Sequence, residues 1–176
     1  KGRAMEILGC FTPDFGAFGA WWQQYFMRHT CQEGAGALPV YVGLPGGLDG
    51  LDTMMQGGEK RAFETMLQVP ERCFQKVNIE MDWKDYDGLE YLAEKSLADV
   101  ELRTYEALTG AHADGDVPII ALECETLDEY HMGELLYFLE LSAAIYACAC
   151  GIEPFDPVPQ PTRELAARLL GKPENM

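Results

Sequence analysis

The stretch Met5-Glu6-Ile7-Leu8-Gly9-Cys10-Phe11, followed by Thr12-Pro13-Asp14, sets the pattern for the whole chain. Its first seven residues are short and largely apolar, which predicts a strand, and Thr-Pro-Asp is typical of a helix start. A helix is predicted next, from Phe15 to Met27. Its aromatic side chains share one face and are more typical of a core than of a ligand platform; they are Phe18, Trp21, Trp22 and Tyr25.

The same alternation continues to the end of the chain. Further strands are predicted at 39–44, 63–69 and 117–122, and residues 74–79 fit either a strand or an extended loop. Helices are predicted at 48–56, from Asp87 to about Gly110, from Thr126 to Gly151 and at 162–170. Capping boxes at 87–90 and 126–129 support the second and third of these starts. This order predicts an α/β fold, a three-layer sandwich with a mostly parallel sheet flanked by helices.

The second predicted capping box, at 126–129, opens a helix of unusual composition. Between Leu135 and Ala149 the helix is apolar on nearly every side, so we expect it to be buried against other elements. It contains Glu140 and is too short an apolar run for a membrane span. The sequence therefore predicts no membrane partner.

Composition bounds the class of protein. The 176 residues suit one domain, 1–176, with a helical extension from about 154 to 176. A net charge of −16 argues against nucleic-acid binding, and an anionic ligand would need a local basic pocket. The first ten residues do not resemble a signal peptide, which predicts a cytoplasmic protein. The chain starts at Lys1 rather than Met, which indicates a piece of a longer protein or a processed chain.

The six cysteines and three histidines show no zinc-ligand spacing, so we expect no metal. Cys148-x-Cys150 is interpreted as packing. We expect His112 to cap or pack near the end of its helix and His131 to be partly exposed. His29 is expected in a solvent-facing loop.

Several segments resemble the second sugar-isomerase (SIS) domain of bacterial-type glucose-6-phosphate isomerases. The matching segments keep the family's order and cover nearly the whole chain. They are Glu6-Ile7-Leu8, Trp21-Trp22-Gln23-Gln24, Asp87-Gly88-Leu89-Glu90-Tyr91-Leu92-Ala93, Ala111-His112-Ala113-Asp114-Gly115-Asp116-Val117-Pro118 and Gly151-Ile152-Glu153-Pro154-Phe155-Asp156. The resemblance implies an SIS-type fold, aldose–ketose isomerisation of a sugar phosphate, no cofactor, and a partner that is a second copy or an N-terminal isomerase domain.

The same resemblance implies that the catalytic positions are altered. Arg28 stands where the family has its Glu base, Asp49 where it has the ring-opening His, and Arg163 nearest to its C-terminal Lys. A guanidinium remains protonated and cannot act as a general base. The family's phosphate-binding loop and enediolate-stabilising Arg belong to an earlier domain. The resemblance thus leaves no catalytic residue clearly retained.

Three functions remain open from the sequence. The first is an isomerase-like domain that is inactive alone. The second is half of a split isomerase completed by an N-terminal domain. The third is a regulatory module that holds a sugar phosphate between Arg28 and Arg163.

Overall fold

The computed structural model describes residues 2–32, 34–69, 77–80, 84–155 and 160–171. Four parallel strands form one sheet in the order β2-β1-β3-β4. The strands are β1 (Met5–Cys10), β2 (Leu38–Gly43), β3 (Ala62–Gln68) and β4 (Ile119–Glu123). The helices are α1 (Gly16–Thr30), α2 (Leu44–Gly57), α3 (Leu97–Asp114), α4 (Glu129–Ala149) and α5 (Pro161–Leu169), with 3-10 turns at Pro13–Phe15 and Glu90–Leu92.

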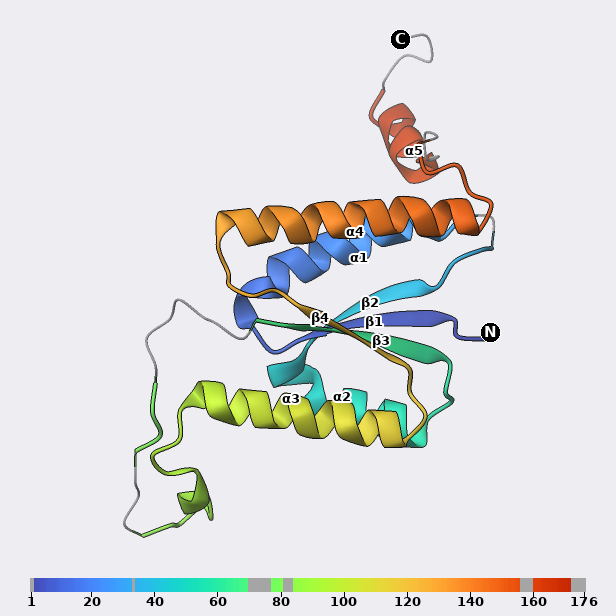
Figure 1. The fold of residues 1–176 in the computed structure, drawn as a ribbon. Helices are drawn as coiled ribbons and strands as arrows, with labels where there is room; N and C mark the ends of the chain where they lie inside the picture. Colours follow the sequence, from blue (N-terminus) through green and yellow to red (C-terminus); the bar gives the residue numbers. More distant parts are fainter. Residues whose placement is uncertain (1, 33, 70–76, 81–83, 156–159, 172–176) are drawn as a thin grey trace.

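The helices form two layers around the sheet. Helices α1 and α4 lie together on one face, and α2 and α3 lie on the other (Figure 1). This arrangement confirms the predicted three-layer sandwich and its parallel sheet.

Strand β1 is buried on both faces because it lies inside the sheet. Successive side chains of a strand point to opposite faces, so Ile7 packs into the α2/α3 side and Leu8 into the α1/α4 side. Trp22 is fully buried in the cluster with Leu8, and Phe18 is nearly so. Trp21 and Tyr25 pack partly buried against that cluster, as expected for a core stripe.

Helix α3 begins ten residues later than predicted. The predicted cap at Asp87 is followed by Gly88 with φ of +73° and Glu94 with φ of +65°, which a helix cannot accommodate. The capping box is formed instead by Ser96 and Asp99. The Ser96 hydroxyl accepts from the Asp99 N–H at 3.0 Å, and the Ser96 N–H donates to the Asp99 carboxylate at 3.2 Å. The helix also continues past Gly110 to Asp114.

Helix α4 begins after Asp128, not after Thr126 as predicted. The Asp128 carboxylate accepts from the His131 N–H at 2.8 Å and so caps the helix. The prediction that α4 is buried against other elements is confirmed for one face, formed by Leu135, Leu139, Ala143 and Ala147. The rest of the helix is exposed or half-buried.

The segment before α3, two cysteines and α4 were also subjects of predictions. Residues 74–76 of the predicted strand or loop lie outside the described residues, and Asn78 forms an isolated antiparallel bridge with Ser96. Cys148 is exposed, so its interpretation as packing is wrong, while Cys150 is half-buried. By length and composition alone, α4 is the one helix in the described part of the chain that could cross a membrane.

Candidate functional site

The carboxyl ends of β1 and β3 form the topological switch point of the sheet. From β1 the chain leads through α1 to β2, and from β3 it leads through α3 to β4, so the connections diverge between these two strands. Open parallel sheets bind ligands at such a point. A cavity of about 390 Å³ lies here. Its lining comes from the ends of both strands, the start of α3 and the segment before it: Phe11, Thr12, Leu67, Gln68, Val69, Asn78, Glu94, Ser96, Ala98, Asp99, Glu101, Leu102 and Tyr105.

The charge of this cavity disfavours an anionic ligand. Three of its lining residues are acidic, namely Glu94, Asp99 and Glu101, and none of the lining residues in the described ranges is Lys or Arg. Burial, followed by the charge of Glu123, raises the pKa of the Tyr105 phenol, so this side chain stays neutral. A phosphate group needs basic side chains or converging N–H donors, and the described lining supplies no basic side chain.

The three positions that the resemblance aligns with the family's catalytic residues do not line this cavity. Arg28 lies exposed in the last turn of α1, and Asp49 lies exposed on α2. Because α1 and α2 cover opposite faces of the sheet, these two residues belong to different layers (Figure 1). Arg163 lies exposed on α5, where its Nη1 donates to the Gln160 Oε1 at 3.3 Å. The structure therefore leaves these positions on three separate elements.

The loop predicted around His29 is part of a helix. Helix α1 continues to Thr30, whose hydroxyl donates to the Phe26 carbonyl at 2.7 Å. His29 is half-buried, its ring centroid lies 4.5 Å from that of Tyr25, and its Nδ1 lies 3.3 Å from the Pro154 carbonyl oxygen. The expectation of a solvent-facing loop histidine is wrong. The ring instead joins the end of α1 to the segment after α4.

His131 is partly exposed, as predicted. Its Nδ1 lies 2.7 Å from the Asp128 carboxylate, in the first turn of α4. Hydrogen bonds from the His131 backbone and ring lower the pKa of Asp128, and the same carboxylate raises the pKa of His131. This pair serves the helix start rather than a reaction centre.

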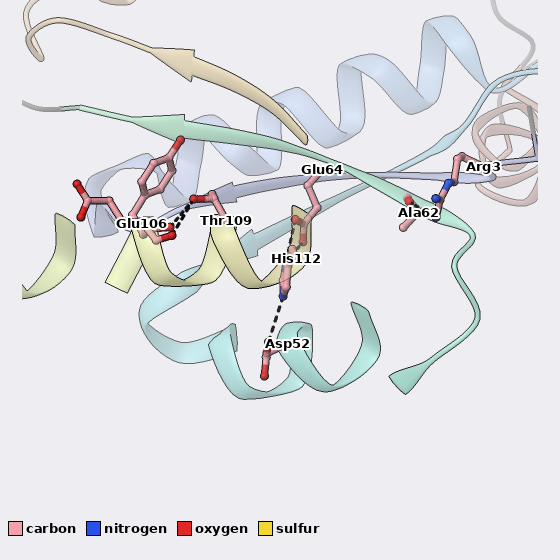
Figure 2. Close-up of polar contacts among 8 residues, drawn as sticks. Arg3, Asp52, Ala62, Glu64, Glu106, Thr109 and His112 are labelled. Carbon is pink, nitrogen blue, oxygen red and sulfur yellow. Dashed lines mark hydrogen bonds and ion pairs between the residues drawn. The ribbon is translucent and has the colours of Figure 1, made fainter. Parts of the chain in front are cut away.

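A buried ionic cluster joins α2, β3 and α3. His112 of α3 lies between two carboxylates, with Nδ1 2.9 Å from both Glu64 oxygens and Nε2 3.2 Å from the Asp52 Oδ1 (Figure 2). The side chains of His112 and Glu64 are 0% exposed, whereas that of Asp52 is 51% exposed. His112 thus packs inside the domain near the end of its helix, as the sequence predicts.

Both ring nitrogens of His112 lie within hydrogen-bond distance of carboxyl oxygens. Burial raises the pKa of Glu64, and the hydrogen bond and charge of His112 oppose that shift. Neither His112 nor its two carboxylate partners line the cavity at the switch point. The cluster ties α2, β3 and α3 together.

Sequence reasoning missed the carboxylate partners of His112. Glu64 is a charged residue inside an otherwise apolar strand, Phe63-Glu64-Thr65-Met66-Leu67, and a buried carboxylate requires a partner. That pattern was the available signal. The identity of the partner, 48 residues away, follows only from the fold.

Comparison with known proteins gives the relatives of this chain. No family model matches the chain. Glucose-6-phosphate isomerases of Clostridioides difficile and Bacillus cytotoxicus are each 34% identical over 174 residues, which is 98% of this chain and 38% of each relative. The chain therefore spans well under half the length of these curated relatives.

Solved structures share the fold. A hypothetical protein from Thermus thermophilus superimposes with a TM-score of 0.84 at 18% identity, covering 97% of this chain and 41% of that one. A glucose-6-phosphate isomerase from Chlamydia trachomatis gives a TM-score of 0.70 at 16% identity, covering 96% and 34%.

The parallel sheet with two helices on each face has the α/β fold of these structures, an SIS-type fold. The chain belongs to the glucose-6-phosphate isomerase family and corresponds to one domain of its members.

Proposed function

We propose that residues 1–176 act as a single glucose-6-phosphate isomerase-type C-terminal domain, with its helical extension from about 154, that does not catalyse isomerisation alone. The proposal rests on Arg28, Asp49 and Arg163, which we align with the family's Glu base, ring-opening His and C-terminal Lys. Each of the three residues is exposed, and each lies on a different helix.

The chemistry of isomerisation explains why these changes matter. Proton transfer between adjacent sugar carbons needs a carboxylate base, and Arg28 supplies a permanent cation instead. A carboxyl group can replace an imidazole in proton transfer only if burial raises its pKa. Asp49 is exposed on α2 and therefore lacks that burial. Arg163 keeps the positive charge of a lysine but donates protons poorly.

The acidic cavity supports the same proposal. A sugar phosphate is anionic, and the described lining of the cavity carries carboxylates and no basic side chain. The regulatory function, with a phosphate held between Arg28 and Arg163, has less support. Both residues are exposed, and the guanidinium of Arg163 is already bonded to Gln160.

A coupled assay with fructose 6-phosphate tests the proposal. We expect no turnover by the purified chain above that of buffer, with the full-length Clostridioides difficile relative as the positive control. Turnover that is lost on changing Arg28, Asp49 or Arg163 to Ala would show that the chain is an isomerase by itself and would reject the proposal.

The split isomerase is a second candidate, supported by the 38% coverage of the relatives. An N-terminal isomerase domain supplied in trans would bring the phosphate site, while a second copy would not. Adding such a domain at high concentration should then produce activity, and no gain would eliminate this candidate. Either function suits a cytoplasmic protein, the compartment that we propose for it.

A further inference from the structure

The acidic cavity at the switch point also has apolar and aromatic walls. Phe11, directly after β1, and Leu67 of β3 are buried lining residues, and α3 adds Leu102 and Tyr105. The rings of Phe11 and Tyr105 meet edge to face, with their centroids 6.5 Å apart. At about 390 Å³ the cavity falls within the size range of small-molecule sites, about 300–1,000 Å³. It therefore offers space and apolar contact for the body of a small organic molecule.

The charged groups of the described lining are all carboxylates. Glu94 precedes α3, and Asp99 and Glu101 lie in its first two turns, where they offset the positive end of the helix dipole. Asp99 also serves the cap of α3 through its hydrogen bonds. The neighbouring cation Lys95 lines a different hollow, and its Nζ donates to the Tyr91 carbonyl oxygen. A positively charged ligand is therefore the kind that this lining attracts.

Thr12 gives a second and independent indication of a ligand. It lines the cavity, and its side chain is almost inaccessible, since the residue is 1% exposed. Its backbone N–H donates to the Cys10 sulfur, and its carbonyl oxygen accepts from the Phe15 N–H. The Thr12 hydroxyl takes part in none of the hydrogen bonds found among the described residues. Polar side chains in such places normally have a partner, and a molecule in the cavity would provide one.

We propose that this cavity binds a small organic cation, namely a primary amine with an apolar or aromatic body. Its ammonium group pairs with the carboxylates of Glu94 and Glu101, and the Thr12 hydroxyl accepts a hydrogen bond from it. Its body packs against the rings of Phe11 and Tyr105, whose faces also attract cations. The net charge of −16 raises the local concentration of such ligands. The proposal does not depend on whether the chain catalyses isomerisation.

A metal ion matches the cavity less well than an amine does. The part of the chain that the structure describes contains no group of three or more His, Cys, Asp or Glu side chains arranged to hold a metal. A metal needs several ligand atoms around one point. An amine instead combines one charged end with a body that uses the apolar walls, so it matches both halves of the lining.

Three compounds of similar shape and different charge test the proposal. They are 2-phenylethylamine, the neutral 2-phenylethanol and the anionic 3-phenylpropionate, each titrated onto the full chain by calorimetry. We expect the amine to bind at least about tenfold more tightly than the alcohol, and its affinity to fall with added salt. We expect no binding of the carboxylate. Failure of the amine to bind at about 10 mM, or equal or tighter binding of either other compound, would overturn the proposal.

Two variants and a matched control assign the binding to this cavity. Glu101→Gln keeps the shape of the side chain and should weaken amine binding about tenfold, while Thr12→Val should weaken it about threefold. The control Asp114→Asn removes the same charge at the other end of α3, where the residue is exposed and outside the cavity, and should leave the affinity unchanged. Equal losses in Glu101→Gln and Asp114→Asn would show general attraction to an acidic surface and reject the site.

Amide chemical shifts locate the amine without relying on any variant. On titration with 2-phenylethylamine, the largest shifts should fall on the amides of Thr12, Gln68 and Ala98, which line the cavity from three elements. Shifts centred instead on the hollow between β4 and α4, around Glu125 and Phe138, would place the ligand elsewhere and overturn the proposal. Urea unfolding of each variant confirms that the folded protein is being compared. An active isolated chain would reject the proposed lack of catalysis and leave these readouts unchanged.

Discussion

Replacing His112 with leucine should be among the most damaging single changes in the domain. Leucine is of comparable size, so the main loss is the imidazole hydrogen bond to Glu64, whose side chain is fully buried. Leaving a buried carboxyl group without its partner costs about 1–3 kcal/mol when the group is neutral and about 3–5 kcal/mol when it is ionised. That is a large share of the roughly 5–15 kcal/mol by which a domain is stable.

Asp52 provides a control from the same cluster. Its side chain is 51% exposed and lies 3.2 Å from the other ring nitrogen. Solvent screens such a pair, so Asp52→Asn should cost only about 0–1 kcal/mol. Losing the contact of His112 with buried Glu64 should therefore cost much more stability than losing its contact with half-exposed Asp52.

Urea unfolding, followed by tryptophan fluorescence, measures these differences. The double variant His112→Leu/Glu64→Leu should recover most of the stability lost in His112→Leu, since it removes the unpaired carboxylate and fills the space with apolar groups. A single-variant cost below about 1 kcal/mol, or a double variant at least as unstable as the single one, would refute the reasoning, because Glu64 would then not need its partner.

Three further predictions concern packing, capping and pH. Gly19→Ala should destabilise the domain by about 1–3 kcal/mol, because the new Cβ would lie 2.1 Å from a ring carbon of Tyr41. The control Gly16→Ala, with no atom within 4 Å of the new Cβ, should leave stability in urea nearly unchanged or raise it. Equal losses in the two variants would contradict the prediction. Ser96→Ala should lower the stability measured by thermal unfolding by about 1 kcal/mol, because it removes the N-cap of α3. Asp87→Ala, at the cap predicted from the sequence, should change stability by no more than about 0.5 kcal/mol. The reverse ranking would place the cap at Asp87. Burial raises the pKa of Glu6. The contribution of Glu6 to stability is therefore present below its unfolded pKa of about 4.3 and is lost as pH rises through the pKa of the folded state. Stability should fall less steeply with rising pH in Glu6→Gln than in the unchanged protein, and identical slopes would contradict the raised pKa.

Much of the fold could be predicted from the sequence because it depends on local patterns. The apolar run at Met5–Cys10 identified β1, and the sites of the other three strands were predicted to within two residues. Helix starts were less certain. Asp87 and Ser96 both precede acidic residues at the spacing of a capping box, and only the backbone conformation at Gly88 and Glu94 decides between them.

The candidate site divides in the same way. The residue types at Arg28, Asp49 and Arg163 are a property of the sequence, and their chemistry follows from identity alone. The cavity at the ends of β1 and β3 could not be assembled from the sequence, since it draws on segments as far apart as Phe11 and Tyr105. His112 was expected to pack, but its two carboxylate partners come from other elements.

The sequence by itself thus determined the alternation of strands and helices and the family resemblance, because these are encoded in neighbouring residues. Tertiary structure alone decided which apolar surface is covered. The composition of α4 shows how much apolar surface the helix has, but not which part of that surface packs against other elements. Helix α1 and the sheet cover one face of α4, whereas Tyr137, Phe138 and Ile145 on the other face remain exposed.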